Sequence, residues 1–280
     1  MDNLKNCFLA VALAGVLFLG TAQMSFGQNV ITNGDFESFT PANGTSPGAG
    51  LDSASNPTYA GGVTLTDWTS QGYNFVFTNG NAGDVAATGS DGALSLWGPN
   101  NPTPTLNGLT LPPQPPGGAN VVANDGAYEV GPLSQTINGL TSGKTYAVSF
   151  EWAGAQQSGF NGATTESWTV SLGAAGLTGG ASASLAGAQT TVPANNATHG
   201  FTGWMSQTFD FTAGSSTETL YFLANGTPTG EPPFSLLSDV SMTPVPEPAA
   251  TAGWTILFAM LIMAGNRAWR LYQKRSSTNA

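Results

Sequence analysis

Cysteine, histidine and basic residues are scarce in this 280-residue sequence. It has one cysteine, Cys7, one histidine, His199, and six lysines and arginines in total. Beyond its N-terminal segment the chain therefore has no cysteine for a disulfide or for thiol catalysis, and no Cys/His set for a zinc site. His199 lies in "NNATHG" without any G-x-S-x-G motif, which favours a solvated loop residue over the base of a Ser-His-Asp triad.

Positive charge is missing above all from the middle of the chain. Of the 16 acidic residues, Asp2 and Glu247 lie outside residues 28–243, which leaves 14 acids there against one base, Lys144, and a charge of about −13. An anionic surface of this kind repels nucleic acid and anionic lipid, so we exclude nucleic-acid binding. The same charge attracts calcium.

Residue alternation dominates the middle region, which has no convincing helix pattern. The segment "KTYAVSFEW" places Tyr146, Val148, Phe150 and Trp152 on one face of a strand and Glu151 on the other. Further alternating or apolar segments are "YNFVFTNG", "GALSLWG", "LSQTIN", "ESWTVSLG", "WMSQTFDFTA" and "ETLYFLANG". The predicted fold class is all-β, an antiparallel β-sandwich.

Three segments rich in glycine, proline and small polar residues are predicted loops: Thr40–Gly62, Pro99–Gly118 and Gly173–Gly200. Pro99–Gly118 contains seven prolines, too many for a central strand. It is either a linker between two domains or a surface loop of one domain. We favour a loop within one sandwich spanning 28–243, because neither half alone has enough strands for a core.

The N-terminus resembles a secretory signal peptide over residues 1–27. Lys5 supplies a weak positive region, Cys7–Gly20 is apolar, and small residues precede Gln28 or, alternatively, Gln23. The sequence therefore predicts export, with an N-terminal signal helix.

The C-terminus combines a short apolar span with a basic tail. Residues 249–265 are 17 residues without charge, about 26 Å of helix, which is barely the thickness of a bilayer core. A cluster of four basic residues follows: Arg267, Arg270, Lys274 and Arg275. The pattern predicts a transmembrane helix with the body outside the membrane. The alternative is a buried core helix followed by a solvated tail.

The residues before this span are Val245, Pro246, Glu247 and Pro248. Box, span and basic cluster together, residues 244–275, resemble the PEP-CTERM sorting signal of Gram-negative bacteria. The resemblance implies recognition and cleavage by an exosortase-type enzyme, transient insertion in the inner membrane, and delivery to the cell envelope, cell surface or extracellular matrix. It also implies an association with exopolysaccharide or biofilm.

The two ends of the body resemble a second family, the galactose-binding-like jelly rolls and related carbohydrate-binding modules. The matching residues are Asn33, Gly34, Phe36 and Glu37 near the start, and Asp239 and Val240 near the end. Ser238 interrupts the pattern before Asp239 and weakens the transfer of a role to that residue. The resemblance implies a jelly-roll-like sandwich in which the first and last strands lie close together.

If those strands are adjacent, Asp35, Glu37 and Asp239 could share a structural calcium ion with backbone carbonyls. The alternative, which we favour, is that Asp35 and Glu37 are turn and solvent-facing residues. No other cofactor is predicted.

Sugar binding requires exposed aromatic side chains with polar neighbours. Trp68, Tyr73 and Trp97 lie beside predicted loops and are the candidates, whereas the alternation assigns Trp152 and Trp168 to the core. A polysaccharide hydrolase would instead need paired carboxylates, for which the candidates are Glu129, Glu151 and Glu166. The leading prediction is a non-enzymatic surface or matrix protein; a calcium-dependent carbohydrate-binding module and a hydrolase are the alternatives.

Overall fold

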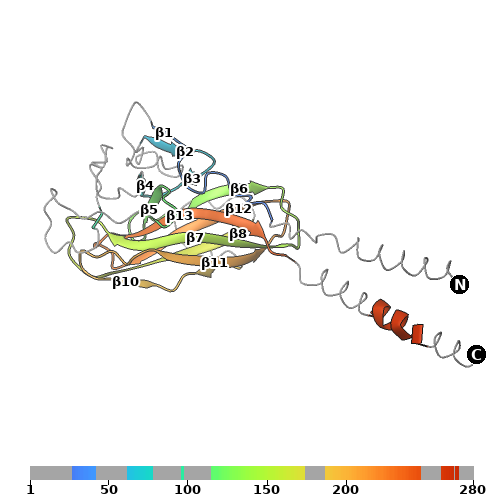
Figure 1. Ribbon diagram of the computed structural model, residues 1–280. Helices are drawn as coiled ribbons and strands as arrows, with labels where there is room; N and C mark the ends of the chain where they lie inside the picture. The colour runs from blue at the N-terminus through green and yellow to red at the C-terminus, as the bar shows by residue number, and fades with distance from the viewer. Residues whose placement is uncertain are drawn as a thin grey trace, which may run out of the picture. The chain divides into compact units, whose positions relative to one another are not determined.

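The computed structural model describes residues 27–41, 62–77, 96–97, 115–173, 187–246, 260–267 and 269–270. The chain divides into two compact units (Figure 1). One is the body, Gln28–Glu247, and the other combines Met1–Gly27 with Pro248–Ala280.

The described part of the body contains only β-strands and connecting segments, and all strand pairs are antiparallel (Figure 1). The strands are β1 (Phe39–Pro41), β2 (Val63–Leu65), β3 (Thr69–Ser70), β4 (Asn74–Phe77), β5 (Val121–Asp125), β6 (Leu133–Asn138), β7 (Thr145–Gln156), β8 (Thr164–Gly173), β9 (Gln189–Thr190), β10 (Ala194–Asn196), β11 (Met205–Thr212), β12 (Thr217–Thr227) and β13 (Pro233–Pro244).

Two sheets form a sandwich. One has the order β10-β8-β12-β6-β3, with β9 also paired to β8, and the other has the order β11-β7-β13-β5-β4. From β5 to β8, and again from β11 to β13, successive strands alternate between the two sheets. The predicted antiparallel β-sandwich is therefore confirmed, and its strand order is jelly-roll-like.

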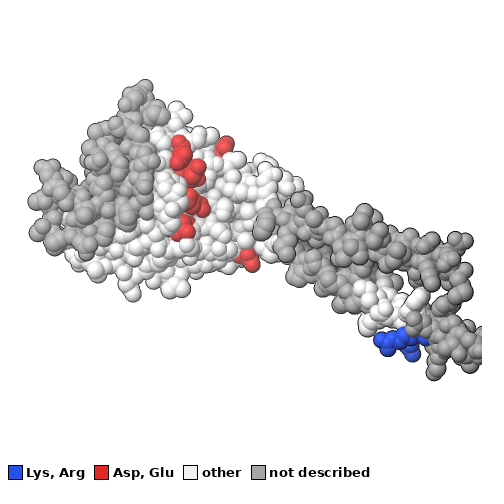
Figure 2. All heavy atoms as spheres, viewed as in Figure 1, with Lys and Arg blue, Asp and Glu red and all other residues white. Residues whose placement is uncertain are grey.

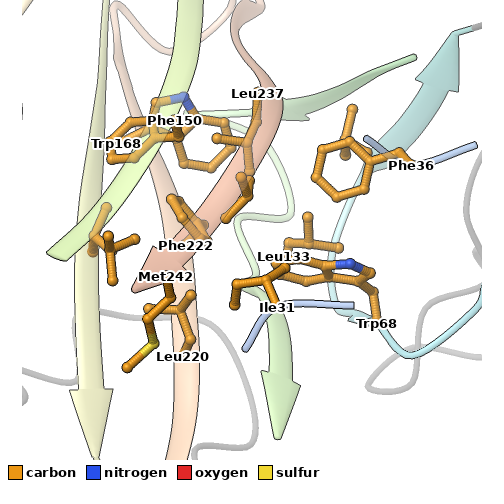
Figure 3. Packing of buried hydrophobic residues seen from close by; sticks show 14 of the residues in the cluster. Ile31, Phe36, Trp68, Leu133, Phe150, Trp168, Leu220, Phe222, Leu237 and Met242 are labelled. Carbon is orange, nitrogen blue, oxygen red and sulfur yellow. The ribbon is translucent and has the colours of Figure 1, made fainter. Parts of the chain in front are cut away.

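The core between the sheets follows the predicted alternation. Phe150 and Trp152 of β7 face Trp168 of β8 and Phe222 of β12, and each of these side chains is at least 97% buried. Figure 3 shows Phe150, Trp168 and Phe222 close together, with Leu237 of β13 beside them. Because the alternation fixes which residues face inward, Trp152 and Trp168 were correctly assigned to the core.

A second apolar cluster lies on the opposite, outer face of the five-stranded sheet. Its members alternate along their strands with the core residues: Phe75, Phe77, Leu96, Val121, Ala123, Ala153, Ala155, Phe234 and Leu236. Leu96 is brought there by an isolated bridge to Gln157, next to the end of β7. This half of the sheet is consequently buried on both faces.

One local expectation is confirmed and another needs correction. The segment "LSQTINGLTSGKTYAVSF" forms strand, turn and strand as its sequence suggests, with positive φ at Gly139 and Gly143, and the turn carries the chain from one sheet to the other. The expected first strand at 29–38 is an irregular segment rather than a strand. It nevertheless lies against β13, where the N–H of Val30 donates to the carbonyl of Met242 at 2.9 Å. The predicted closeness of the first and last segments of the body is thus confirmed.

Strand β13 contains a bulge between Ser238 and Ser241, where two residues face only one on β7. Asp239 lies in this bulge with φ of 49°, a left-handed conformation that Asp tolerates better than most residues. The bulge redirects the Asp239 side chain and also breaks the inward–outward alternation of β13.

Apart from Gly27, the second unit is described only at its short helix, residues 260–267 and 269–270. No helix among the described residues is long and apolar enough to cross a membrane. Arg267 and Arg270 lie on this helix and are exposed. The predicted signal segment up to residue 26, Glu247 and Pro248, the part of the span before residue 260, and Lys274 and Arg275 lie outside the described residues.

Candidate functional site

The residues predicted to bind metal lie in one region of the body, between the N-terminal segment and the β13 bulge. Val240 N–H donates to the carbonyl of Gly34 at 2.9 Å, which places Asp35 beside Asp239. A Cβ on Gly34 would overlap the carbonyl of Val240, so only glycine allows this close approach. The glycine of the N-G-x-F-E pattern therefore brings the N-terminal segment onto β13.

Two shallow depressions adjoin at this place and share two residues, Asn33 and Asp35. The larger, about 610 Å³, is lined by Asn33, Asp35, Glu37, Ser38, Phe39, Thr66 and Asp67. The smaller, about 360 Å³, is lined by Asn29, Ile31, Asn33, Gly34, Asp35, Asp239, Val240 and Ser241. We call Asp35, Glu37, Asp67, Glu151 and Asp239 the acidic patch. Figure 2 shows acidic side chains aligned on one face of the body, without a Lys or Arg among the described residues of that face.

Asp239 is electrostatically the most constrained residue of the patch. Partial burial raises its pKa, and the negative charges of Glu151, Asp35 and Glu37 raise it further, against a backbone hydrogen bond from Gly117. Its Oδ2 is buried and has no hydrogen-bond partner. A Cβ on Gly117 would overlap both carboxylate oxygens, so this glycine leaves the room that the carboxylate occupies. A cation here would relieve the repulsion within an anionic cluster that no Lys or Arg of the described residues neutralises.

Left-handed backbone is concentrated at the same place. Asn33, Phe36, Asp67 and Asp239 have φ values of 49°, 55°, 65° and 49°. For a bulky residue such as Phe36 this backbone conformation is strained. Its fully buried ring packs edge-on against Trp68, with the ring centroids 5.4 Å apart, and this packing offsets part of the strain. Such strain commonly marks binding sites, because the fold has to impose it.

The patch is an incomplete cation site. Within the described residues, no three His, Cys, Asp or Glu side chains converge closely enough to form a metal-binding group. The carbonyls of Gly34 and Asp35 already accept hydrogen bonds from the N–H groups of Val240 and Asn120. Asp239 therefore fits a cation ligand, whereas Asp35 and Glu37 supply charge nearby rather than a preformed set of ligands.

Two of the three predicted sugar-binding aromatics are buried. Trp68 is 5% exposed, and its Nε1 donates to the carbonyl of Asn33, inside the main core. Trp97 is fully buried and its ring lies 4.3 Å from that of His199. Neither side chain offers the accessible face that a sugar would need, and Tyr73, the third candidate, is half-buried.

Tyr73 belongs to a cluster of rings at the edge of the five-stranded sheet. Its ring lies 5.6 Å from that of Tyr128, nearly perpendicular to it, 4.6 Å from Phe75 and 6.3 Å from Phe234. Tyr128 is 51% exposed. Every other aromatic residue of the described body is buried or half-buried. We call these four residues the aromatic ledge.

Asp125 holds the ledge in place. Its Oδ1 accepts hydrogen bonds from the N–H groups of Ala127 and Tyr128, at 2.8 and 3.0 Å, which fixes the turn that bears Tyr128. The Asp125 N–H donates to the carbonyl of Tyr73. Burial raises the pKa of Asp125 to about 6 despite these hydrogen bonds, and its Oδ2 has no partner.

The candidate acids of a hydrolase do not meet. Glu151 is on the outer side of β7, Glu129 is exposed in the turn after β5, and Glu166 is fully buried on the inner side of β8. His199 is a half-buried loop residue whose Nε2 is hydrogen-bonded to Asn161, and its ring packs on Trp97, so the expected solvated residue is instead packed.

Sequence analysis missed Tyr128, and also Phe201 and Trp204, two half-buried rings 6.1 Å apart beside the outer apolar cluster. All three lie in irregular segments or turns, "DGAYEVG" and "HGFTGW", where no alternation predicts exposure. Their flanking glycines mark turns, which was the only signal available.

Comparison with known proteins gives likeness of overall arrangement only. No protein-family model matches the sequence, and no curated protein matches it. Similar solved structures include a CBM4 structure (16% identity, TM-score 0.33, covering 77% of this chain and 99% of that chain). Others are the CBM22-1 xylan-binding domain of Paenibacillus barcinonensis Xyn10C (11%, 0.34, 79% and 97%) and the arabinose-bound MgGH51 α-L-arabinofuranosidase (15%, 0.29, 74% and 32%). At these scores the likeness carries no argument, so the fold rests on the strand pairing described above.

Proposed function

We propose that the body is a non-enzymatic carbohydrate-binding β-sandwich of an exported protein, and that the aromatic ledge is its sugar-binding surface. The observation that carries this proposal is the half-exposed ring of Tyr128, which packs edge-on against Tyr73. A rigidly supported ring with one exposed part offers an apolar surface for a sugar at a small cost in conformational entropy. Asp125 supports both rings, because its side chain accepts from the N–H of Tyr128 and its own N–H donates to the carbonyl of Tyr73.

The position of the ledge in the body fits a protein that is held at its ends. The first and last residues of the body lie close together. Asn29 accepts a hydrogen bond from Met242 N–H, and three residues further Val245 N–H donates to the carbonyl of Thr145. Phe234, a member of the ledge, lies ten residues before Pro244 on β13, which corresponds to roughly 30 Å along the strand. A body anchored or sorted through either end would present the ledge at its opposite end.

The sorting part of the proposal follows from the resemblance of 244–275 to the PEP-CTERM signal. Val245 still hydrogen-bonds to Thr145, and Pro246 is exposed, so the box begins where β13 ends. We propose processing by an exosortase-type enzyme and association with exopolysaccharide at the envelope, surface or matrix. Mass spectrometry of the exported protein is expected to give a C-terminus near Pro248, and an intact Ala280 would contradict cleavage.

We further propose that the acidic patch binds calcium, with Asp239 as its principal side-chain ligand and the remaining ligands drawn from backbone carbonyls and water. The support is the partnerless Oδ2 of Asp239 amid like charges. Calcium at 100 times its Kd would stabilise the body by about 2.7 kcal/mol. Asp239→Asn is expected to abolish this shift in a thermal melt with calcium against chelator. Asp210→Asn, an exposed change on β11, is the control and should keep it.

Affinity electrophoresis in gels that contain neutral or anionic polysaccharides tests sugar binding. Tyr128→Ala is expected to weaken retardation at least about five-fold, equivalent to about 1 kcal/mol. Val192→Ala, at an exposed apolar residue between β9 and β10, is the matched control. Retardation that Tyr128→Ala leaves unchanged would refute the ledge as the site. Release of reducing sugar, lost in Glu151→Gln, would instead support the hydrolase alternative.

A further inference from the structure

A buried carboxyl group lies between the sheets, at the end of β7 and the beginning of β8. Glu166 is fully buried on the same face of β8 as Trp168, and its Oε1 accepts a hydrogen bond from the Thr164 hydroxyl. Its Oε2 has no hydrogen-bond partner. That oxygen lies directly against Gly154 of β7, where a Cβ would overlap it. The amide of Asn196 faces the same carboxyl, but its Nδ2 is also without a hydrogen-bond partner.

The segment 197–204, which follows β10, is hydrogen-bonded to the last residues of β7. Thr202 N–H donates to the carbonyl of Gly154, and Gly154 N–H donates to the Thr202 hydroxyl, at 3.0 and 2.8 Å. His199 N–H donates to Oε1 of Gln156 at 3.0 Å. These hydrogen bonds attach the segment directly beside Gly154, while His199 also contacts Asn161 and Trp97, and Phe201 and Trp204 pack beside the outer apolar cluster.

Charged groups around Glu166 are few. The residues that face it are Thr164 on its own strand, Asn196 on β10, Gly154 on β7, Gly226 opposite it on β12, and Thr202 next to Gly154. None of these can titrate. His199 and Glu231 lie at the same end but contact Gln156 rather than Glu166. Burial raises the pKa of Glu166 to about 7, with Thr164 and Asn196 acting against the rise.

We propose that Glu166 makes the 197–204 segment a pH-dependent latch, which is closed while the carboxyl is neutral and opens when it is ionised. An ionised carboxylate here lacks partners for one oxygen and is shielded from water, which is costly. Strands β7, β8 and β12 are long and share many backbone hydrogen bonds, so separating them would cost much free energy. Local opening of the half-exposed 197–204 segment beside Gly154 costs less. Because Phe201 and Trp204 lie in this segment, opening would also move this second aromatic pair.

Hydrogen exchange with mass spectrometry on the whole secreted body tests the latch. Exchange of peptides spanning 197–204 is compared at pH 5.5 and 8.5, after correction for intrinsic rates. If opening returns the pKa of Glu166 from about 7 to its ordinary 4.5, protection should fall about 30-fold over this interval. Peptides from β7 and β12 should change much less.

Glu166→Gln is expected to remove this pH dependence. The matched control is Glu218→Gln, at another buried glutamate with a partnerless oxygen, eight residues from Gly226 along β12, and it should keep the wild-type behaviour. Equal protection at both pH values in the wild type, or the same loss in Glu166→Gln, would overturn the proposal. Should Glu166→Gln fail to fold, a carboxyl ¹³C NMR titration of the wild type decides it, because an apparent pKa near 4.5 is incompatible with the latch. Sugar binding at the ledge is independent of either outcome.

Discussion

Replacing Asp125 by asparagine should remove a specific part of the pH dependence of stability. The carboxyl is 2% exposed, and burial raises its pKa from an ordinary 3.8 to about 6. Asparagine keeps an oxygen for the N–H groups of Ala127 and Tyr128 but cannot ionise. The turn that supports the ledge should therefore persist, while the titration disappears.

The sign and size follow from proton linkage. Since the pKa is higher in the folded than in the unfolded state, the folded protein binds more protons between these two pKa values. Stability contributed by Asp125 is therefore fully present below pH 4 and falls as the pH rises through 6. Between pH 4 and 7 the loss amounts to about 2.5 kcal/mol, or about 5–10 °C in Tm for a body of this size.

Chemical denaturation of the wild type and Asp125→Asn from pH 4 to 7 measures the effect. The difference in unfolding free energy between them should move by about 2.5 kcal/mol in favour of Asp125→Asn as the pH rises, whatever its constant offset. Asp210→Asn on the exposed side of β11 is the control and should run parallel to the wild type. Parallel curves for Asp125→Asn would refute the argument. Asp125→Ala, which also removes the acceptor for Tyr128, should lose sugar binding that Asp125→Asn retains.

Further predictions concern packing around the acidic patch. Phe36→Ala empties a fully buried site and should cost about 3–5 kcal/mol of unfolding free energy, measured by denaturant melts; a loss below 1 kcal/mol would mean that the ring is not in the core. Gly117→Ala should remove any calcium-induced rise in Tm, because the added methyl group would overlap the Asp239 carboxylate. Gln135→Ala removes a donor and an acceptor that bind the backbone of Thr32, at 2.8 and 3.1 Å, and should cost about 1–3 kcal/mol; Gln135→Glu, which keeps only the acceptor, should restore part of it.

The strands that alternate strictly could be predicted from sequence, because burial of one face of a sheet leaves a period of two in the residues. This holds for β7 and β8, whose inner faces are Phe150, Trp152 and Trp168. The same rule also places Glu166 inside, two residues before Trp168, so its burial was visible in the sequence. The sequence nevertheless led us to predict Glu166 only as a candidate acid of a polysaccharide hydrolase.

Residues in irregular segments could not be placed in this way. Trp68 follows a turn at Asp67, and Trp97 is positioned by a single bridge beside Gln156, so neither has a strand whose alternation gives its direction. The same holds for Tyr128, whose exposure depends on an aspartate three residues earlier. The neighbourhood of Asp35 and Asp239 could be expected only through the resemblance, since the two residues are more than two hundred positions apart.

The composition explains why burial raises the pKa of carboxyl groups in this body instead of placing them in ion pairs. With 14 acids and one lysine in 28–243, at least 13 carboxylates cannot have a lysine partner of their own. A carboxyl that folding buries in such a chain becomes less acidic, as Asp125 and Glu166 do, rather than forming an ion pair. Both pKa values, about 6 and about 7, lie in the range where histidine normally titrates. A body with a single histidine thus has two buried acids that respond to pH near neutrality, one under the aromatic ledge and one under the 197–204 segment.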